Sequence, residues 1–136
     1  MTNPKSEARN SKQTQITKIQ NPKQYDLEDR TYNFAKRVRT FVKKLVKTIA
    51  NIEDGKQLVK ASVSVGANYI EANESLSKKD FIMRIKICRK EAKESRYWLR
   101  LIDTQDDLQL NNERKDLAQE ATELMNIFGS ILRNSK

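Results

Sequence analysis

The segment SKKDFIMRIKICRKEAKESRYWLRLI (residues 77–102) decides the fold class of this chain. Its apolar and small residues recur at alternating intervals of four and three positions, which places them along one side of an α-helix. These residues are Phe81, Ile85, Cys88, Ala92, Ser95, Leu99 and Ile102. Because Ser77 and Asp80 have the spacing of a capping box, the sequence predicts that this helix begins there.

Two further helices are predicted before this segment. Apolar residues at three- and four-residue spacing, from Phe34 to Ile49, predict a helix over residues 27–50, with Asp26 as its N-cap. The sequence NIEDG (residues 51–55) is typical of a turn, and a second helix is predicted over residues 55–74.

The second predicted helix carries two neighbouring apolar stripes rather than one. A helix that is apolar on most sides is buried on most sides, so it lies at the centre of the fold or faces another subunit. Gly66, inside this helix, predicts the close approach of another backbone, since glycine there costs about 1 kcal/mol relative to alanine.

A fourth helix is predicted over residues 112–133. Four amphipathic helices with short connections predict an all-α, antiparallel up-down-up-down four-helix bundle over residues 25–136. Residues 1–24 are rich in Asn, Gln, Lys, Ser and Thr and are predicted to form a disordered basic tail.

The composition excludes several classes of activity. The 136 residues include no histidine, which excludes hydrolases that use a Ser–His or Cys–His pair. We therefore predict no catalytic residue, no metal and no cofactor, and a non-enzymatic protein. The single cysteine, Cys88, cannot form an internal disulfide, and neither a secretory signal nor a membrane span is evident. These features predict a cytoplasmic protein with no membrane partner, in which Cys88 is a buried structural thiol.

Several polar residues fall among the apolar positions of the second and third predicted helices. We expect them to form a structural polar network or an interface between subunits, with Lys86 or Glu94 as candidate partners for the second helix. The alternatives are a ligand site at Ser64, Asn68 and Glu71, and a metal site or an acid–base pair built from the glutamates. The residues are Ser64, Asn68, Glu71, Glu91, Glu94 and Trp98.

The formal net charge of +9 is unevenly distributed. Residues 77–103 carry nine basic and four acidic side chains, whereas residues 104–136 carry four basic and six acidic ones. Such asymmetry indicates a polyanionic partner or an acidic protein face. The candidate phosphate-binding residues are Lys36, Arg37, Arg39, Lys43, Lys44 and Lys47 on the first predicted helix, and Lys86, Arg89, Lys90, Lys93 and Arg100 on the third. Nothing in the sequence indicates base-specific recognition.

Three stretches, SVGANYIEA (64–72), KKDFI (78–82) and KEAKESRYWL (90–99), resemble the bacterial four helix bundle protein family. Its members are encoded in intervening sequences of 23S ribosomal RNA genes and were formerly labelled S23 ribosomal proteins. The resemblance covers about residues 25–133. It implies an antiparallel four-helix bundle that assembles as a homopentameric ring. The accessory variability determinant of diversity-generating retroelements is related, and it implies RNA or DNA and a reverse transcriptase as partners.

Two functions are favoured, and an enzyme that uses Glu71, Glu91 and Glu94 with a metal ion is a third alternative. The first is an oligomeric basic scaffold that binds RNA or DNA through phosphate contacts. The second is a protein–protein adaptor whose basic surface binds an acidic partner, with no role in nucleic-acid binding.

Overall fold

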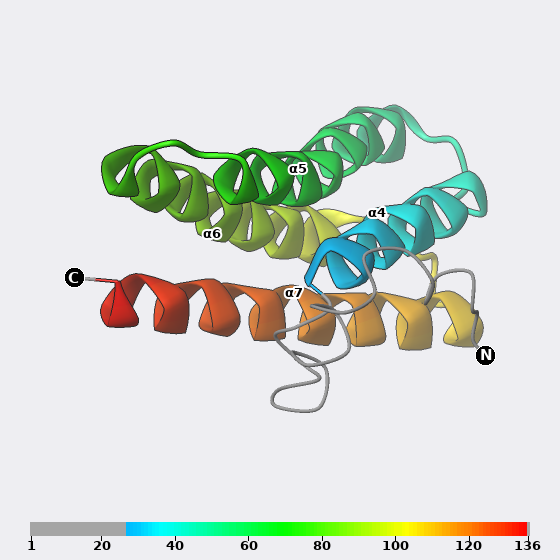
Figure 1. The fold of residues 1–136 in the computed structure, drawn as a ribbon. Helices are drawn as coiled ribbons and strands as arrows, with labels where there is room; N and C mark the ends of the chain where they lie inside the picture. The colour runs from blue at the N-terminus through cyan, green and yellow to red at the C-terminus, as the bar shows by residue number, and fades with distance from the viewer. Residues whose placement is uncertain (1–26, 136) are drawn as a thin grey trace, which may run out of the picture.

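The structure, a computed structural model, describes residues 27–135, and these residues form four α-helices and no β-strand (Figure 1). The helices are α4 (Leu27–Lys43), α5 (Ile49–Asn73), α6 (Lys78–Leu101) and α7 (Leu108–Asn134). The predicted all-α class is confirmed. The predicted tail over residues 1–24 and the predicted N-cap Asp26 lie outside the described residues. In the described part of the chain, no helix combines the length and the apolar character that crossing a membrane requires.

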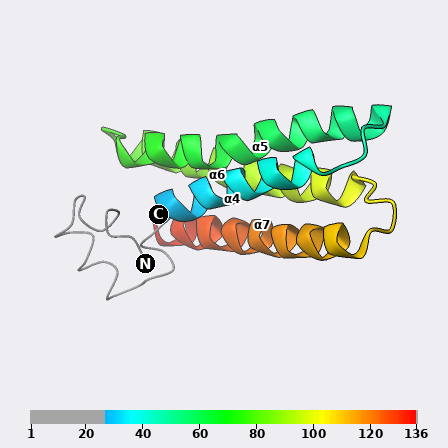
Figure 2. The same ribbon diagram turned by 90° about the vertical axis from the view of Figure 1, so that its right-hand side faces the viewer.

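Each helix packs against two others. Contacts join α4 to α5, α5 to α6, α6 to α7, and α4 to α7. The α4–α5 and α6–α7 connections lie at one end of the bundle, and the α5–α6 connection lies at the opposite end (Figure 2). α4 consequently stands diagonally across the bundle from α6, and this arrangement separates the basic residues of the two helices.

The predicted boundary between the first two helices is wrong. α4 ends at Lys43 rather than near residue 50, and α5 begins at Ile49 rather than near residue 55. Thr48 is the N-cap of α5, and its hydroxyl accepts a hydrogen bond from the backbone N–H of Asn51 at 3.0 Å. Ile49, which the apolar spacing assigns to the stripe of the first helix, is 84% exposed.

Tertiary contacts explain why residues 51–55 continue a helix. The buried side chain of Asn51 donates hydrogen bonds to the carbonyls of Val46 at 3.0 Å and Asp103 at 2.9 Å, and it accepts one from the Asp103 N–H at 3.0 Å. A Cβ atom on Gly55 would lie only 3.2 Å from Cγ1 of Val42. Asn51 and Gly55 therefore join the end of α4 to α5, although both residue types favour turns locally.

The other helix ends follow local capping chemistry. The hydroxyl of Ser77 accepts a hydrogen bond from the Asp80 N–H at 3.1 Å, which confirms the predicted start of α6. α7 begins at Leu108, four residues earlier than predicted, because the carboxylate of Asp107 caps it through the Leu110 N–H at 2.9 Å. Gln105 and Asp106 adopt left-handed backbone conformations that reverse the chain before this cap.

The core contains the predicted seam of α6 facing the other helices. Ile85, Cys88, Ala92 and Leu99 have no exposed surface, and Phe34 and Phe128 are equally buried in α4 and α7. Burial raises the pKa of the Cys88 thiol to about 12, so it stays protonated and is a poor nucleophile at neutral pH. The expectation of a buried structural thiol is confirmed.

Gly66 marks a close approach between α4 and α5. A Cβ atom on Gly66 would lie 2.9 Å from Oγ1 and 3.2 Å from Cβ of Thr31, closer than ordinary van der Waals contact. Thr31 is buried at this crossing, and its hydroxyl donates to the carbonyl of Leu27 at 2.7 Å. The predicted packing role of this glycine is confirmed.

Candidate nucleic-acid interface

The polar edge of α5 joins this helix to α6 within one chain. The side-chain amide of Asn68 donates to the carbonyl of Ser64 at 2.9 Å and accepts a hydrogen bond from Nη1 of Arg84 at 2.9 Å. Arg84, rather than the expected Lys86 or Glu94, is thus the partner across the two helices. In two antiparallel helices, residues that are equally many positions before and after the connection lie side by side. Asn68 and Arg84 have this relation about the α5–α6 connection, so the sequence spacing could have identified Arg84 as the partner.

The three glutamates do not form a metal-binding cluster. Glu71 and Glu94 are exposed, whereas Glu91 is half-buried with its carboxylate 3.7 Å from Nζ of Lys90. Burial, reinforced by the nearby charge of Glu94, raises the pKa of Glu91. Among residues 27–135, no three His, Cys, Asp or Glu side chains are grouped so that they could hold a metal ion.

Trp98 packs against the core rather than standing free on the surface. Its ring is half-buried and meets the exposed ring of Tyr97 edge to face, with centroids 5.0 Å apart. This arrangement fits the structural role assigned to Trp98 from the sequence.

The candidate basic residues of α4 are exposed, but part of their charge is neutralised by α7. Nζ of Lys44, just after α4, lies 2.6 Å from Oε2 of Glu113. Nε of Arg30 lies 2.7 Å from Oε2 of Glu120, and its Nη2 lies 2.7 Å from Oε1 of Glu123. These acidic residues lie along the side of α7 that faces α4. The sequence pattern of the first helix could not reveal this neutralisation, because the neighbouring helix α7 supplies the acidic residues.

The basic residues of α6 form a continuous stripe. They recur at alternating intervals of three and four positions, which aligns them along one side of the helix. The α6 stripe consists of Lys86, Arg89, Lys93, Arg96 and Arg100. Nη1 of Arg96 donates to Oγ1 of Thr122 on α7 at 3.2 Å, so the stripe runs beside the contact between α6 and α7.

The α6 stripe differs by two residues from the set predicted on this helix. Arg96 is absent from the predicted set, although its three- and four-residue spacing from Lys93 and Arg100 is a signal that identifies it. Lys90 is in the predicted set but lies off the stripe, next to Glu91.

Comparisons with known proteins support these assignments of fold and family. The sequence model of a family described as 23S rRNA-intervening sequence protein matches residues 23–130. This chain belongs to that family. The recognition made from its residues is confirmed, and the match includes α4, α5, α6 and most of α7.

A solved structure from Bacteroides thetaiotaomicron has the same fold as this member of the intervening-sequence family. That protein belongs to the S23 ribosomal protein family and has unknown function. It is 29% identical to this chain, with a TM-score of 0.66, and the alignment covers 77% of this chain and 96% of the other. No curated protein matches the chain.

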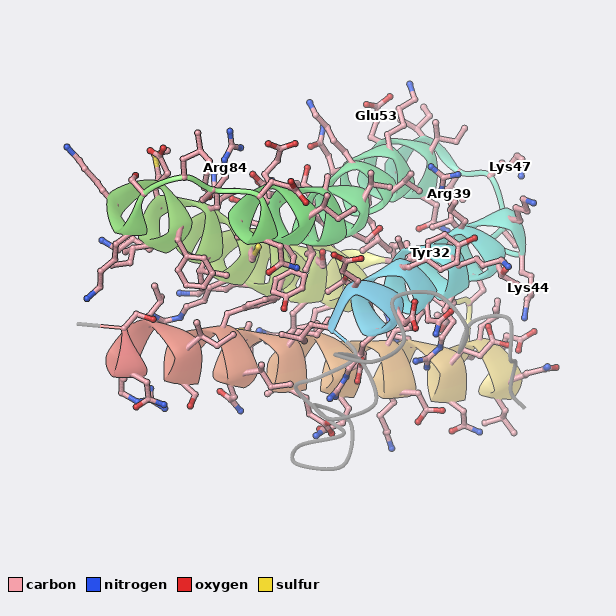
Figure 3. The ribbon with its side chains drawn as sticks, in the orientation of Figure 1. Tyr32, Arg39, Lys44, Lys47, Glu53 and Arg84 are labelled. Atoms are coloured by element: carbon pink, nitrogen blue, oxygen red, sulfur yellow. The ribbon has the colours of Figure 1, made fainter. Side chains whose placement is uncertain are left out.

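The basic residues predicted on two helices of this family member do not form one surface of a single chain. α4 and α6 are diagonal, so their outward sides face away from each other (Figure 2). Arg39, Lys44 and Lys47 lie toward the end of the bundle where α4 leads into α5 (Figure 3), and Arg100 at the end of α6 lies toward the same end, so the diagonal placement of the helices is what separates the two groups. One chain therefore offers two separate basic regions. Among residues 27–135, no acidic side chain forms an ion pair with a residue of the α6 stripe.

Proposed function

We propose that this protein is a non-enzymatic, oligomeric scaffold that binds RNA or DNA through phosphate contacts. The α6 stripe is the principal contact surface in this proposal, and the exposed cations of α4 form a secondary one. The observation that carries it is the alignment of five cations along one side of α6, with no carboxylate in ion-pair distance of any of them among residues 27–135.

The dimensions of the α6 stripe suit a nucleic-acid backbone. From Lys86 to Arg100 the helix rises about 21 Å, because each residue adds about 1.5 Å. A row of cations of this length contacts several successive phosphates, and each phosphate that it neutralises releases counterions. Four of the five side chains are exposed, and Arg96 is half-buried.

We further propose that the chain forms an up-down-up-down bundle that assembles as a homopentameric ring. The positions of the three connections support the first statement (Figure 2). Exposed apolar side chains on two sides of the chain support the second: Tyr32 and Ile70 line a groove between α4 and α5 and are 62% and 50% exposed, while Met83 and Leu101, near the two ends of α6, are each 49% exposed. Contacts between different surfaces of identical chains close into rings when the rotation allows it.

A ring would strengthen binding to a long polyanion. Five copies of the α6 stripe raise the effective concentration of each copy once one of them has bound. Light scattering should give five times the chain mass of 15.9 kDa. A monomer mass at micromolar concentration contradicts the ring.

Fluorescence anisotropy with labelled RNA over a series of salt concentrations tests nucleic-acid binding. K93Q/R100Q should weaken binding and reduce the slope of log K against log salt by about 2, roughly one for each cation that the two substitutions remove. K43Q/K47Q removes the same charge from the α4 side and should change binding less. The absence of RNA and DNA binding by the wild type at low salt contradicts the proposal.

The adaptor function has a specific observation in its favour. Between α4 and α5, a groove with apolar walls formed by Val63 and Ile70 is bordered by Lys36 and Arg39. A partner with an amphipathic acidic helix fits such a surface. In that case V63D should abolish the capture of an acidic amphipathic peptide, whereas K93Q/R100Q, which lies on α6, should leave that capture unchanged.

A further inference from the structure

Two arginines from different helices meet above a glycine at the contact between α6 and α7. A Cβ atom on Gly129 would lie 3.5 Å from Nη1 of Arg133 and 3.9 Å from Nε of Arg89. Both guanidinium groups therefore come within contact range of a single point on α7. Gly129 itself is buried, whereas Arg89 and Arg133 are exposed.

Neither guanidinium is neutralised by the described part of the chain. Among residues 27–135, no carboxylate lies within ion-pair distance of Arg89 or Arg133. The carboxylates of α7 that form ion pairs, such as Glu120, do so with α4 instead. Lys86 and Lys93 stand three residues before and four residues after Arg89, so further positive charge lies on the same side of α6.

We propose that Arg89 and Arg133 bind one phosphate group above Gly129. Guanidinium groups present planar pairs of N–H donors that match the oxygens of a phosphate, and two such groups from different helices can hold it from two sides. Two adjacent like charges without an anion repel each other, and a bound phosphate removes that repulsion.

The proposed phosphate site is independent of the proposed function, because it can exist whether or not the protein binds nucleic acid. The phosphate group comes either from an RNA or DNA backbone or from a small phosphorylated molecule, and inorganic phosphate serves as the probe for the second source. Arg133 lies beyond the last residue of the family match, so it is not among the residues that identify the family.

G129E provides a sharp test because it places a carboxylate where the phosphate would bind. A glutamate at 129 can pair with Arg133 four residues later and with Arg89 across the helix contact. The variant should unfold at a higher temperature, by about 4 °C or more, since it also removes a helical glycine. Gly129→Ala is the matched control: its gain in helix propensity is at least as large as that of G129E, and its methyl group fits at ordinary contact distances.

The readout is the melting temperature of the full chain in sodium phosphate and in sodium chloride at equal ionic strength and pH. Phosphate should raise the melting temperature of the wild type and of Gly129→Ala, and it should leave that of G129E unchanged. An equal phosphate-dependent shift in G129E, or no shift in the wild type, overturns the inference.

Anisotropy with a labelled single-stranded RNA identifies the source of the phosphate. A loss of affinity of about tenfold in G129E relative to Gly129→Ala assigns the site to the nucleic-acid backbone. If RNA binding is absent but the phosphate-dependent shift is lost in G129E, the site stands, its ligand is a small phosphate, and the proposed function fails. If RNA binds equally to all variants and the phosphate shift persists in G129E, the site fails while the proposed function stands.

Discussion

The amide of Asn68 and the guanidinium of Arg84 form a hydrogen bond of 2.9 Å between α5 and α6. The same amide donates to the carbonyl of Ser64, so both polar ends of the Asn68 side chain have partners within one chain. The bond from Arg84 fixes the register of the two helices, because sliding by one turn would leave Oδ1 of Asn68 without this donor, whereas the bond to Ser64 lies within α5.

A double-mutant cycle measures this link between helices. N68A and R84Q should each lower the free energy of unfolding, and their coupling energy should be about 1 kcal/mol because the bond has a charged donor but is only partly buried. Urea unfolding of the two single variants and the double variant gives the value. A coupling energy within error of zero would show that the two side chains act independently.

The three glycines of the chain, all of them helical, should respond differently to alanine. At Gly66 the new methyl group would lie 2.9 Å from Oγ1 of Thr31, so G66A should destabilise the protein by about 1–3 kcal/mol. At Gly129 the nearest atoms are at ordinary distances, and Gly129→Ala should stabilise by up to about 1 kcal/mol.

Chemical denaturation of both alanine variants tests the contrast. T31A removes the hydroxyl from the crossing and should recover part of the stability that G66A loses. Equal effects of the two alanine substitutions would contradict the close approach of α4 and α5 at Gly66.

Capping and periodicity predict most of the fold. The start of α6 at Ser77 and the buried seam through Ile85, Cys88 and Leu99 follow from local sequence alone. The boundary between α4 and α5 does not follow from the local sequence, because Asn51 and Gly55 are residue types that favour a turn. The packing of Gly55 against Val42 and the hydrogen bonds of Asn51 to a distant loop add to the local cap at Thr48 and hold these residues in the helix.

The charged surface was predictable to a smaller extent. Helical spacing correctly aligns Lys86, Arg89, Lys93 and Arg100, and it could also have included Arg96. It cannot show that α4 and α6 are diagonal, or that Glu113 lies beside Lys44, since both depend on how the helices are arranged in space. The meeting of Arg89 and Arg133 above Gly129 depends on the same arrangement.

The half-buried carboxyl of Glu91 should make stability depend on pH. Its pKa is raised chiefly by burial, so the folded state binds a proton more readily than the unfolded state. The free energy of unfolding should therefore fall as the pH rises from the ordinary glutamate pKa of about 4.3 through the raised value in the folded state. At neutral pH the charged Glu91 is a destabilising group.

E91Q isolates this contribution. The variant should be more stable than the wild type at pH 7, and the difference should vanish below about pH 4, where the glutamate is protonated in both states. Thermal unfolding of both proteins from pH 3.5 to pH 7 gives the comparison. A difference that is constant over this range would assign the effect to a cause other than ionisation.

The ion pairs of Arg30 should anchor α4 to α7. Its guanidinium donates from Nε to Oε2 of Glu120 at 2.7 Å and from Nη2 to Oε1 of the same carboxylate at 2.9 Å, and Nη2 also donates to Glu123. The side chains of Arg30 and Glu120 are only 18% and 16% exposed. R30Q would leave the Glu120 carboxylate partly buried without its cation, so we expect a loss of about 1–3 kcal/mol in the free energy of unfolding.

The exposed pair of Lys56 and Glu53 is the matched control for Arg30. Its two groups are 3.7 Å apart, and both side chains are about two-thirds exposed, so K56Q should change stability by less than about 0.5 kcal/mol. Urea unfolding at low and at high salt separates the two cases, because a partly buried bidentate pair is screened less than an exposed one. R30Q and K56Q variants of equal stability would show that the Arg30 ion pairs do not hold α4 against α7. In that case the apolar contacts of Phe34 and Leu117 with the core would be sufficient to keep α4 in place.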